Sequence, residues 1–239
     1  ALCMSRSQAF DNKANDIFSV FLGLENGSPI GHDFERLMWF HDAGVRYVTL
    51  CHSGHNQICD SCAPANGRWN GLSPFGKDLI REMNRIGMLV DVSHISDTSF
   101  YDVLDTSAGP VVATHSCCRA LANHPRNMTD DMIHKLGERG GVMGLNFCSE
   151  FLVQLPAGVH NPGTIDDIVK HAKHIVNVGG MEVLGLGSDF DGIEGHEELV
   201  DVRGMEKLYD RLLKGGFTSS QVDMIFAENV LRVYRECLG

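Results

Sequence analysis

The feature that most constrains the fold is a repeated alternation of short apolar runs with longer segments of helical spacing. Each run is rich in Val, Ile and Leu and nearly continuous in its hydrophobicity, which is typical of parallel strands buried on both faces. The six runs cover residues 17–24, 45–51, 88–93, 111–114, 141–146 and 183–188. The pattern predicts an α/β fold with six parallel strands.

Segments with apolar residues at helical spacing lie between these runs and predict the helices that cover the sheet. They are residues 33–43, 77–86, 97–106, 130–139 and 165–178, with residues 222–235 as a last amphipathic helix. Thr129 and Thr164 stand where N-caps are expected. The strand and helix segments follow one another without a linker, so we expect residues 1–239 to form a single domain.

Composition narrows the class of protein. The chain has a net charge of −11 and no run of Lys or Arg, which disfavours nucleic acid as a partner. No apolar run approaches the roughly 20 residues that span a bilayer, and no charged-then-apolar leader is seen, so we expect a soluble, cytoplasmic chain. Eight cysteines in this length are too sparse for a disulfide framework, so we expect reduced thiols and no metal site at Cys59 and Cys62.

Polar residues at the ends of the runs discriminate between an open sheet and a closed barrel. Glu25, His52, His94, His115 and Asp189 each come directly after a run. A lone histidine there is more often a packing residue, but five residues of metal-ligand or acid–base type in one position favour a catalytic site at the carboxyl ends of a (β/α)8 TIM-type barrel. The chain has no complete dinucleotide-binding glycine motif, no phosphate-binding loop and no serine nucleophile elbow.

These strand-end motifs resemble those of the renal (membrane) dipeptidase family, from about residue 17 to residue 234. Residues 23–27 are similar to the strand end whose glutamate bridges two metals, and residues 45–52 to the next strand, with a substrate-contacting histidine. Residues 87–94 and 110–116 are similar to the strands that supply two histidine ligands of the second metal. Residues 119–131 are similar to the segment whose arginine binds the substrate carboxylate, and residues 185–192 to the last strand, with its acid–base aspartate.

The resemblance implies a metallo-dipeptidase that hydrolyses dipeptides with a metal-activated hydroxide, with Zn²⁺ as the favoured metal and a homodimer as a further expectation. Its implied roles for this chain are metal ligation by Glu25, His94 and His115, substrate binding by His52 and Arg126, and catalysis by Asp189 and His52. His52 would stabilise the oxyanion, and Asp189 would carry the proton to the leaving amine.

One motif of the family is absent from the sequence. The family begins with a strand that ends in His-x-Asp, two ligands of the first metal, and no such tripeptide precedes Glu25. With six of eight strands recognised, we expect a barrel that lacks its first strands, with one zinc site supported and a second in doubt. Two alternatives stay open, a catalytically impaired or fragmentary metal-binding barrel and another amidohydrolase activity.

Overall fold

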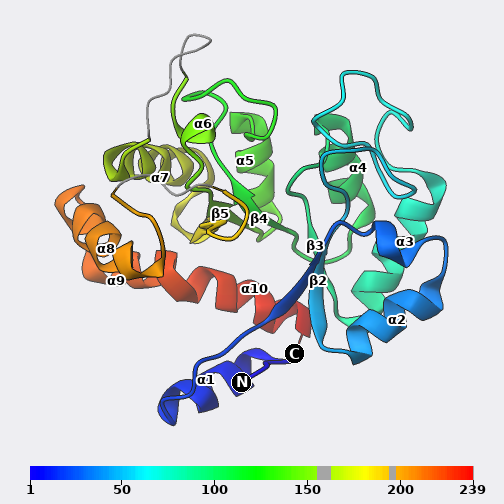
Figure 1. Cartoon of the computed structure of the whole chain (residues 1–239), viewed down its shortest axis with the longest axis horizontal. Coiled ribbons are helices and arrows are strands. Elements are labelled where there is room, and N and C mark those ends of the chain that lie inside the picture. The colour runs from blue at the N-terminus through cyan, green and yellow to red at the C-terminus, as the bar shows by residue number, and fades with distance from the viewer. Residues whose placement is uncertain (155–162, 194–197, 239) are drawn as a thin grey trace. The chain divides into compact units, whose positions relative to one another are not determined.

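The computed structural model describes residues 1–154, 163–193 and 198–238, and its chain divides into two compact units. Unit 1 comprises Ala1–Val112 and Leu231–Gly239, and unit 2 comprises Ala113–Val230. Figure 1 labels the helices and strands of both units.

The strands form a parallel sheet in which they follow one another in chain order, from β1 to β6. Their bounds are β1 Leu22–Glu25, β2 Val45–Thr49, β3 Leu89–Asp91, β4 Val112–Ser116, β5 Val142–Leu145 and β6 Leu184–Leu186. All six lie within or across the runs predicted from the sequence, which confirms the predicted α/β class. The prediction of one domain for residues 1–239 stays a prediction.

Unit 1 packs its helices against β2 and β3. It contains α1 Arg6–Ala14, η1 Ser28–Ile30, α2 Phe34–Asp42, α3 Pro74–Ile86 and α4 Asp97–Thr106. In Figure 1, α2 and α3 lie beside β2 and β3, with which they are in contact. Leu79, Ile80 and Met83 of α3 are fully buried, as expected of a helix with one apolar face.

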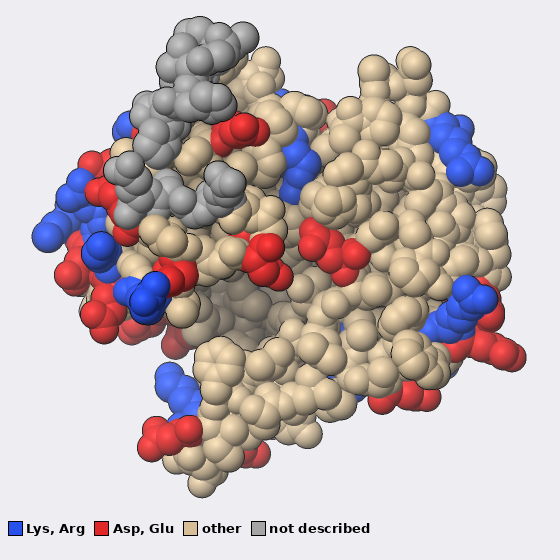
Figure 2. All heavy atoms as spheres, in the orientation of Figure 1, with Lys and Arg blue, Asp and Glu red and all other residues tan. Residues whose placement is uncertain are grey.

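Unit 2 repeats the arrangement around β5 and β6. It contains α5 Asp130–Glu138, α6 Ser149–Leu152, α7 Ile165–Gly179, η2 Met181–Val183, η3 Val202–Gly204, α8 Met205–Lys214, α9 Ser219–Asp223 and the π-helical turn η4 Met224–Glu228. The last helix, α10 Asn229–Leu238, begins in unit 2 and belongs to unit 1 from Leu231 on. The predicted N-caps are confirmed, because the side chains of Thr129 and Thr164 accept the backbone N–H groups of Met132 and Asp167. Figure 2 shows acidic and basic side chains interleaved over α7 and α8, where Arg211 pairs with Asp166.

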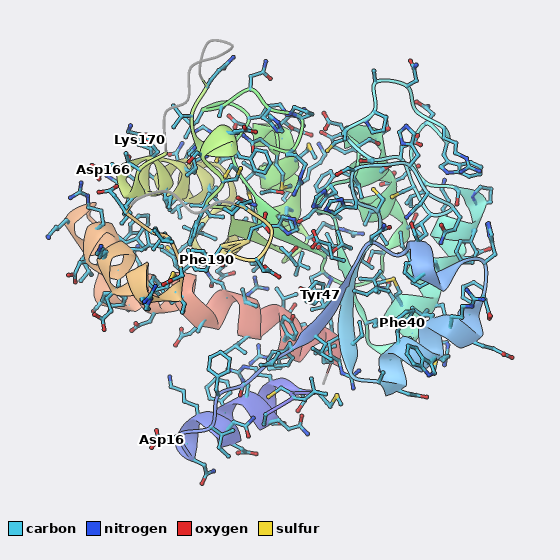
Figure 3. The ribbon with its side chains drawn as sticks, in the orientation of Figure 1. Asp16, Phe40, Tyr47, Asp166, Lys170 and Phe190 are labelled. Atoms are coloured by element: carbon cyan, nitrogen blue, oxygen red, sulfur yellow. The ribbon has the colours of Figure 1, made fainter. Side chains whose placement is uncertain are left out.

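The register of the first three strands brings their carboxyl ends level. Glu25 is paired with Thr49, and Thr49 is paired with Asp91. His52 and His94 each follow three residues beyond those partners, so the chain places them at the same edge of the sheet as Glu25. The ring of Tyr47 in β2, labelled in Figure 3, packs against β1 at Gly23. This contact requires glycine, because a Cβ at residue 23 would lie 1.9 Å from the ring.

Four of the strands and helices, β1, α1, α6 and α8, differ from the sequence prediction. The first strand begins at Leu22 and not at residue 17, and Leu22 and Gly23 are exposed because β1 is an edge strand. The helices α1, α6 and α8 were not predicted. Among the residues that the structure describes, no helix is both long and apolar enough to cross a membrane.

Candidate metal centre and substrate-binding residues

Three predicted site residues of unit 1 form a compact donor cluster. The ligand atoms of Glu25, His52 and His94 all lie within 4.8 Å of one another. The Nε2 atom of His94 lies 3.0 Å and that of His52 lies 3.8 Å from the same carboxylate oxygen, Oε1 of Glu25. The two imidazole rings stack with centroids 4.2 Å apart. His52, which was predicted to contact substrate, therefore lies where a third ligand would be.

Exposure and hydrogen bonding suit these side chains to hold a cation. The side chains of Glu25 and His52 are about half exposed, at 46% and 48%, whereas that of His94 is 10% exposed. Nδ1 of His52 lies 2.9 Å from the Ser53 hydroxyl. When Nδ1 carries the proton in that contact, the lone pair of Nε2 is directed at the shared position beside Glu25.

The backbone is strained at this cluster. Five described residues other than glycine have a positive φ, and two of them are Asn26, at +81°, directly after Glu25, and His94 itself, at +70°. A third is Asp189 in unit 2, at +61°. Such conformations cost of order 1–3 kcal/mol each and persist where surrounding contacts enforce them. Three of the five thus fall at or beside predicted site residues, which supports a functional assignment of these strand ends.

A long loop after β2, residues 52–72, holds its shape through the buried carboxylate of Asp60. This carboxylate accepts the backbone N–H groups of Arg68, Trp69 and Gly71 and lies 3.2 Å from Nδ1 of His55. Burial by itself raises the pKa of Asp60, but the three backbone N–H groups and His55 outweigh it and hold the pKa below its usual value. Asp60 therefore organises the loop.

In unit 2 the structure brings together two further predicted residues. The guanidinium of Arg126 donates to the backbone carbonyl of His115 at 3.2 Å, and it lies 5.5 Å from the ring centroid of Phe151. The ring of Phe151 also packs on His124, whose Nδ1 accepts the Arg126 backbone N–H. Burial and the charge of Arg126 lower the pKa of His124. Phe151 and His124 thus fix Arg126 from two sides, and neither was predicted.

Asp189 has a partner that sequence reasoning missed. Its Oδ2 accepts a hydrogen bond from the Asn146 side chain at 3.0 Å, and the oxygen of that same amide accepts the Cys148 backbone N–H. Asn146 is fully buried and directly follows β5. The apolar run predicted at residues 141–146 includes Asn146, whereas β5 ends at Leu145. Ending that run one residue earlier would have identified Asn146 as a polar residue directly after a strand.

The cysteines agree with the expectation of reduced thiols. All eight cysteines are free thiols. Burial raises the pKa of Cys117 and of Cys118, so neither is an activated thiolate. Of the two asparagines in glycosylation sequons, Asn127 is buried with its amide bonded to two backbone carbonyls, and Asn26 bonds Ser28 beside Glu25.

The donor set of unit 1 fits a divalent transition metal. Two imidazole nitrogens and one carboxylate, directed at one position, are ligands that zinc prefers, and they also suit manganese, iron or cobalt. His94 is nearly buried and Glu25 half exposed, so the cluster leaves one side open, as catalytic metal sites do.

Comparisons with known proteins agree with this geometry. The family model described as Membrane dipeptidase (Peptidase family M19) matches residues 1–238. Dipeptidase tcpJ of Claviceps purpurea is 37% identical over 94% of this chain and 54% of its own length. An uncharacterized dipeptidase of Schizosaccharomyces pombe is 38% identical over 95% of this chain and 54% of its own length. The chain thus spans about half the length of these curated relatives.

A solved structure shares the fold over nearly the whole chain. It is a metallo peptidase from Rhodobacter sphaeroides, liganded with a phosphinate mimic of the dipeptide L-Ala-D-Ala. It superposes with a TM-score of 0.90 at 27% identity and covers 99% of this chain and 68% of its own. Because the family model matches nearly every residue, the chain belongs to the membrane dipeptidase family.

Proposed function

We propose that this chain carries the metal centre and substrate-binding residues of a dipeptidase that hydrolyses the peptide bond of dipeptides. The observation that carries the proposal is the convergence of Glu25, His52 and His94 within 4.8 Å, in a chain of this family. Zinc is the proposed metal. A bound divalent cation lowers the pKa of coordinated water and polarises a carbonyl oxygen.

The protein's own residues supply binding and proton transfer. Glu25, His52 and His94 hold the cation, and His115 keeps its predicted role as a ligand. Arg126 binds the free C-terminal carboxylate of the dipeptide through two parallel hydrogen bonds, because its planar guanidinium matches a carboxylate. Asp189, oriented by Asn146, carries the proton to the leaving amine. As a ligand, His52 would not also stabilise the oxyanion as expected from the sequence, because its Nε2 faces the shared position beside Glu25 and its Nδ1 lies against Ser53.

The substrate class rests on the relatives. The metallo peptidase from Rhodobacter sphaeroides binds a mimic of L-Ala-D-Ala, which supports dipeptides, including those with a D-configured C-terminal residue, as substrates here. A cytoplasmic location and a homodimer stay predictions from the sequence.

Chelation tests the proposed function. Purified protein should hydrolyse a simple dipeptide, lose that activity on treatment with a chelator, and regain it with Zn²⁺. Stoichiometric zinc without hydrolysis would favour a catalytically impaired barrel. Hydrolysis of other amides in preference to dipeptides would favour another amidohydrolase activity.

Arg126→Lys tests the carboxylate-binding role. An ammonium cannot reproduce the bidentate fork, so kcat/KM for a free dipeptide should fall by about 10- to 100-fold. The wild type should already be slow on the same dipeptide with an amidated C-terminus. Equal kcat/KM for the free and amidated dipeptides would remove Arg126 from the site.

A further inference from the structure

The Asn56 side chain connects the segments that carry two of the proposed ligands. It lies in the long loop after β2 and is 7% exposed. Its amide nitrogen donates to the Leu50 carbonyl at 2.7 Å and approaches Asn26 Oδ1 and Ser28 Oγ, both at 3.3 Å. Asn26 directly follows Glu25, and Leu50 comes two residues before His52. One amide group therefore joins the loop after β1 to the end of β2.

The other end of the Asn56 amide is fixed within its own loop. Its oxygen accepts the backbone N–H groups of Ile58 at 2.8 Å and of Cys59 at 3.2 Å. Both amide protons and the oxygen are thus used, and the side chain has one orientation in which all of these bonds form. A buried amide satisfied on every side is costly to replace, because removal leaves several backbone groups without partners.

The bond to Asn26 matters because Asn26 is in the left-handed region. Its side chain accepts the backbone N–H and the hydroxyl of Ser28, and Asn56 adds a third donor to the same oxygen. These bonds stabilise a conformation that an L-residue rarely adopts. That conformation sets the direction in which the chain leaves β1 after Glu25.

The same loop also reaches His94. The Ser61 hydroxyl donates to the His52 carbonyl at 2.5 Å and lies 3.3 Å from the His94 carbonyl, which accepts the Cys62 backbone N–H at 2.8 Å. Residues 56–62 therefore contact groups at or beside all three members of the donor cluster. Ser61 and Cys62 bond backbone carbonyls of the histidines, whereas Asn56 joins the segment after Glu25 to the segment before His52.

We propose that Asn56 is a positioning residue of the metal centre, which sets the spacing of Glu25 and His52 without binding the cation itself. The proposal rests on the proposed function, since it requires that the cluster holds a metal. Side chains that orient ligands typically contribute 10- to 100-fold to metal affinity, which gives the expected size of the effect.

The test is Co²⁺ binding, measured by visible absorption, with Zn²⁺ affinity measured by competition. Asn56→Ala should weaken both affinities about tenfold or more and change the Co²⁺ spectrum. The matched control is Asn84→Ala, because the Asn84 amide accepts from Ala108 and Ser107 at the far end of α3 in the same unit. Asn84→Ala loses two accepted hydrogen bonds, as Asn56→Ala does at Ile58 and Cys59, and should lower the melting temperature but keep Co²⁺ affinity within about twofold.

Asn26→Gly provides a second variant if Asn56→Ala does not fold. Glycine keeps the left-handed backbone and removes the side-chain oxygen that accepts from Asn56 and from Ser28. The other bonds of the Asn56 amide remain, so Asn26→Gly should weaken Co²⁺ binding by a smaller factor than Asn56→Ala. Asn56→Ala should also cost less affinity on the Asn26→Gly background than on the wild type, because the two residues act together.

The outcomes separate this proposal from the proposed function. If the wild type binds Co²⁺ and both Asn56→Ala and Asn26→Gly bind it equally well with an unchanged spectrum, Asn56 only stabilises its loop and the proposal is wrong. If the wild type itself binds no Co²⁺ or Zn²⁺, the metal centre is wrong and the proposal falls with it.

Discussion

The strand ends of the two units are held by different physical means. In unit 1, side chains of one long loop bond to groups at or beside the ligands. Asn56 bonds the side chain of Asn26, which follows Glu25, and Ser61 bonds the backbone carbonyls of His52 and His94. In unit 2, backbone packs directly on backbone, because a Cβ at Gly144 or Gly187 would lie 2.1 Å or 1.9 Å from the Thr114 carbonyl oxygen. Single substitutions in a hydrogen-bonded loop remove a few bonds and can leave the backbone in place. Close backbone packing leaves no room for an added side-chain atom.

The largest expected effect comes from filling the close contact of unit 2. Gly187→Ala places a methyl group against the Thr114 carbonyl, where only backbone can move, and should destabilise the protein by about 3 kcal/mol or more. Urea unfolding measures the change. The control is Gly54→Ala, where the new methyl group meets nothing within 4 Å and the change should stay within about 0.5 kcal/mol. Equal unfolding midpoints for the two variants would remove the contrast between the units.

An intermediate effect is expected in the loop of unit 1. Asp60→Asn keeps the shape of the side chain but replaces one acceptor oxygen by an amide group and removes the charge on which three backbone N–H groups converge. We expect a loss of about 2 kcal/mol in the free energy of unfolding. Faster hydrogen exchange at the Arg68, Trp69 and Gly71 amides would locate the effect, and unchanged exchange there would contradict the assigned role.

The smallest expected effect is a pH-dependent loss of stability in unit 2, at His171. His171 of unit 2 is buried, its Nδ1 accepts the Cys118 N–H, and its Nε2 bonds the Leu152 carbonyl. Burial lowers the pKa of His171, opposed by the Leu152 carbonyl and Asp167 and assisted by His174 and Lys170. The native state therefore binds fewer protons than the unfolded state. This stability is fully present above about pH 6.5 and is lost as the pH falls through the native pKa.

The contribution of Asp60 in unit 1 changes in the same direction but at lower pH. Its pKa is lowered, so its contribution is present above the unfolded value near pH 3.9 and is lost only as the pH falls through the native pKa. At about pH 5, hydrogen exchange, corrected for intrinsic rates, should therefore show the Cys118 amide less protected than at pH 7, with the Trp69 amide unchanged. His171→Gln, which keeps a donor and an acceptor but does not titrate, should abolish the difference at Cys118.

Local pattern predicted most of the elements. The predicted helix over residues 97–106 coincides with α4, because Ser96 caps it and one face is apolar. By contrast, α1 has no buried residue and thus no apolar face to detect, and α8 follows Gly204, which supplies no capping side chain. The strand-start error at residue 17 arose because apolar residues before Leu22 continue the run without pairing as a strand.

The sequence predicted those site residues that could be identified from their position at the end of a strand. Glu25 ends β1, His52 and His94 lie three residues beyond β2 and β3, and all three were identified as candidates from their positions at the ends of the apolar runs. Asn56 and Asp60 lie in a loop without periodicity, and their roles depend on hydrogen-bonding groups up to 30 residues away in the chain. No spacing rule encodes such contacts, so those two residues emerge only from the three-dimensional arrangement.

The most direct test of the central claim is the Zn²⁺ affinity of Glu25→Gln. Both histidines face the same oxygen of Glu25, so the wild type should bind Zn²⁺ tightly and Glu25→Gln should bind it at least about 100-fold more weakly. Glu35→Gln, which neutralises an exposed glutamate of α2 in the same unit, should bind as the wild type does. Wild-type Zn²⁺ affinity in Glu25→Gln would contradict the assignment of this cluster as the metal centre.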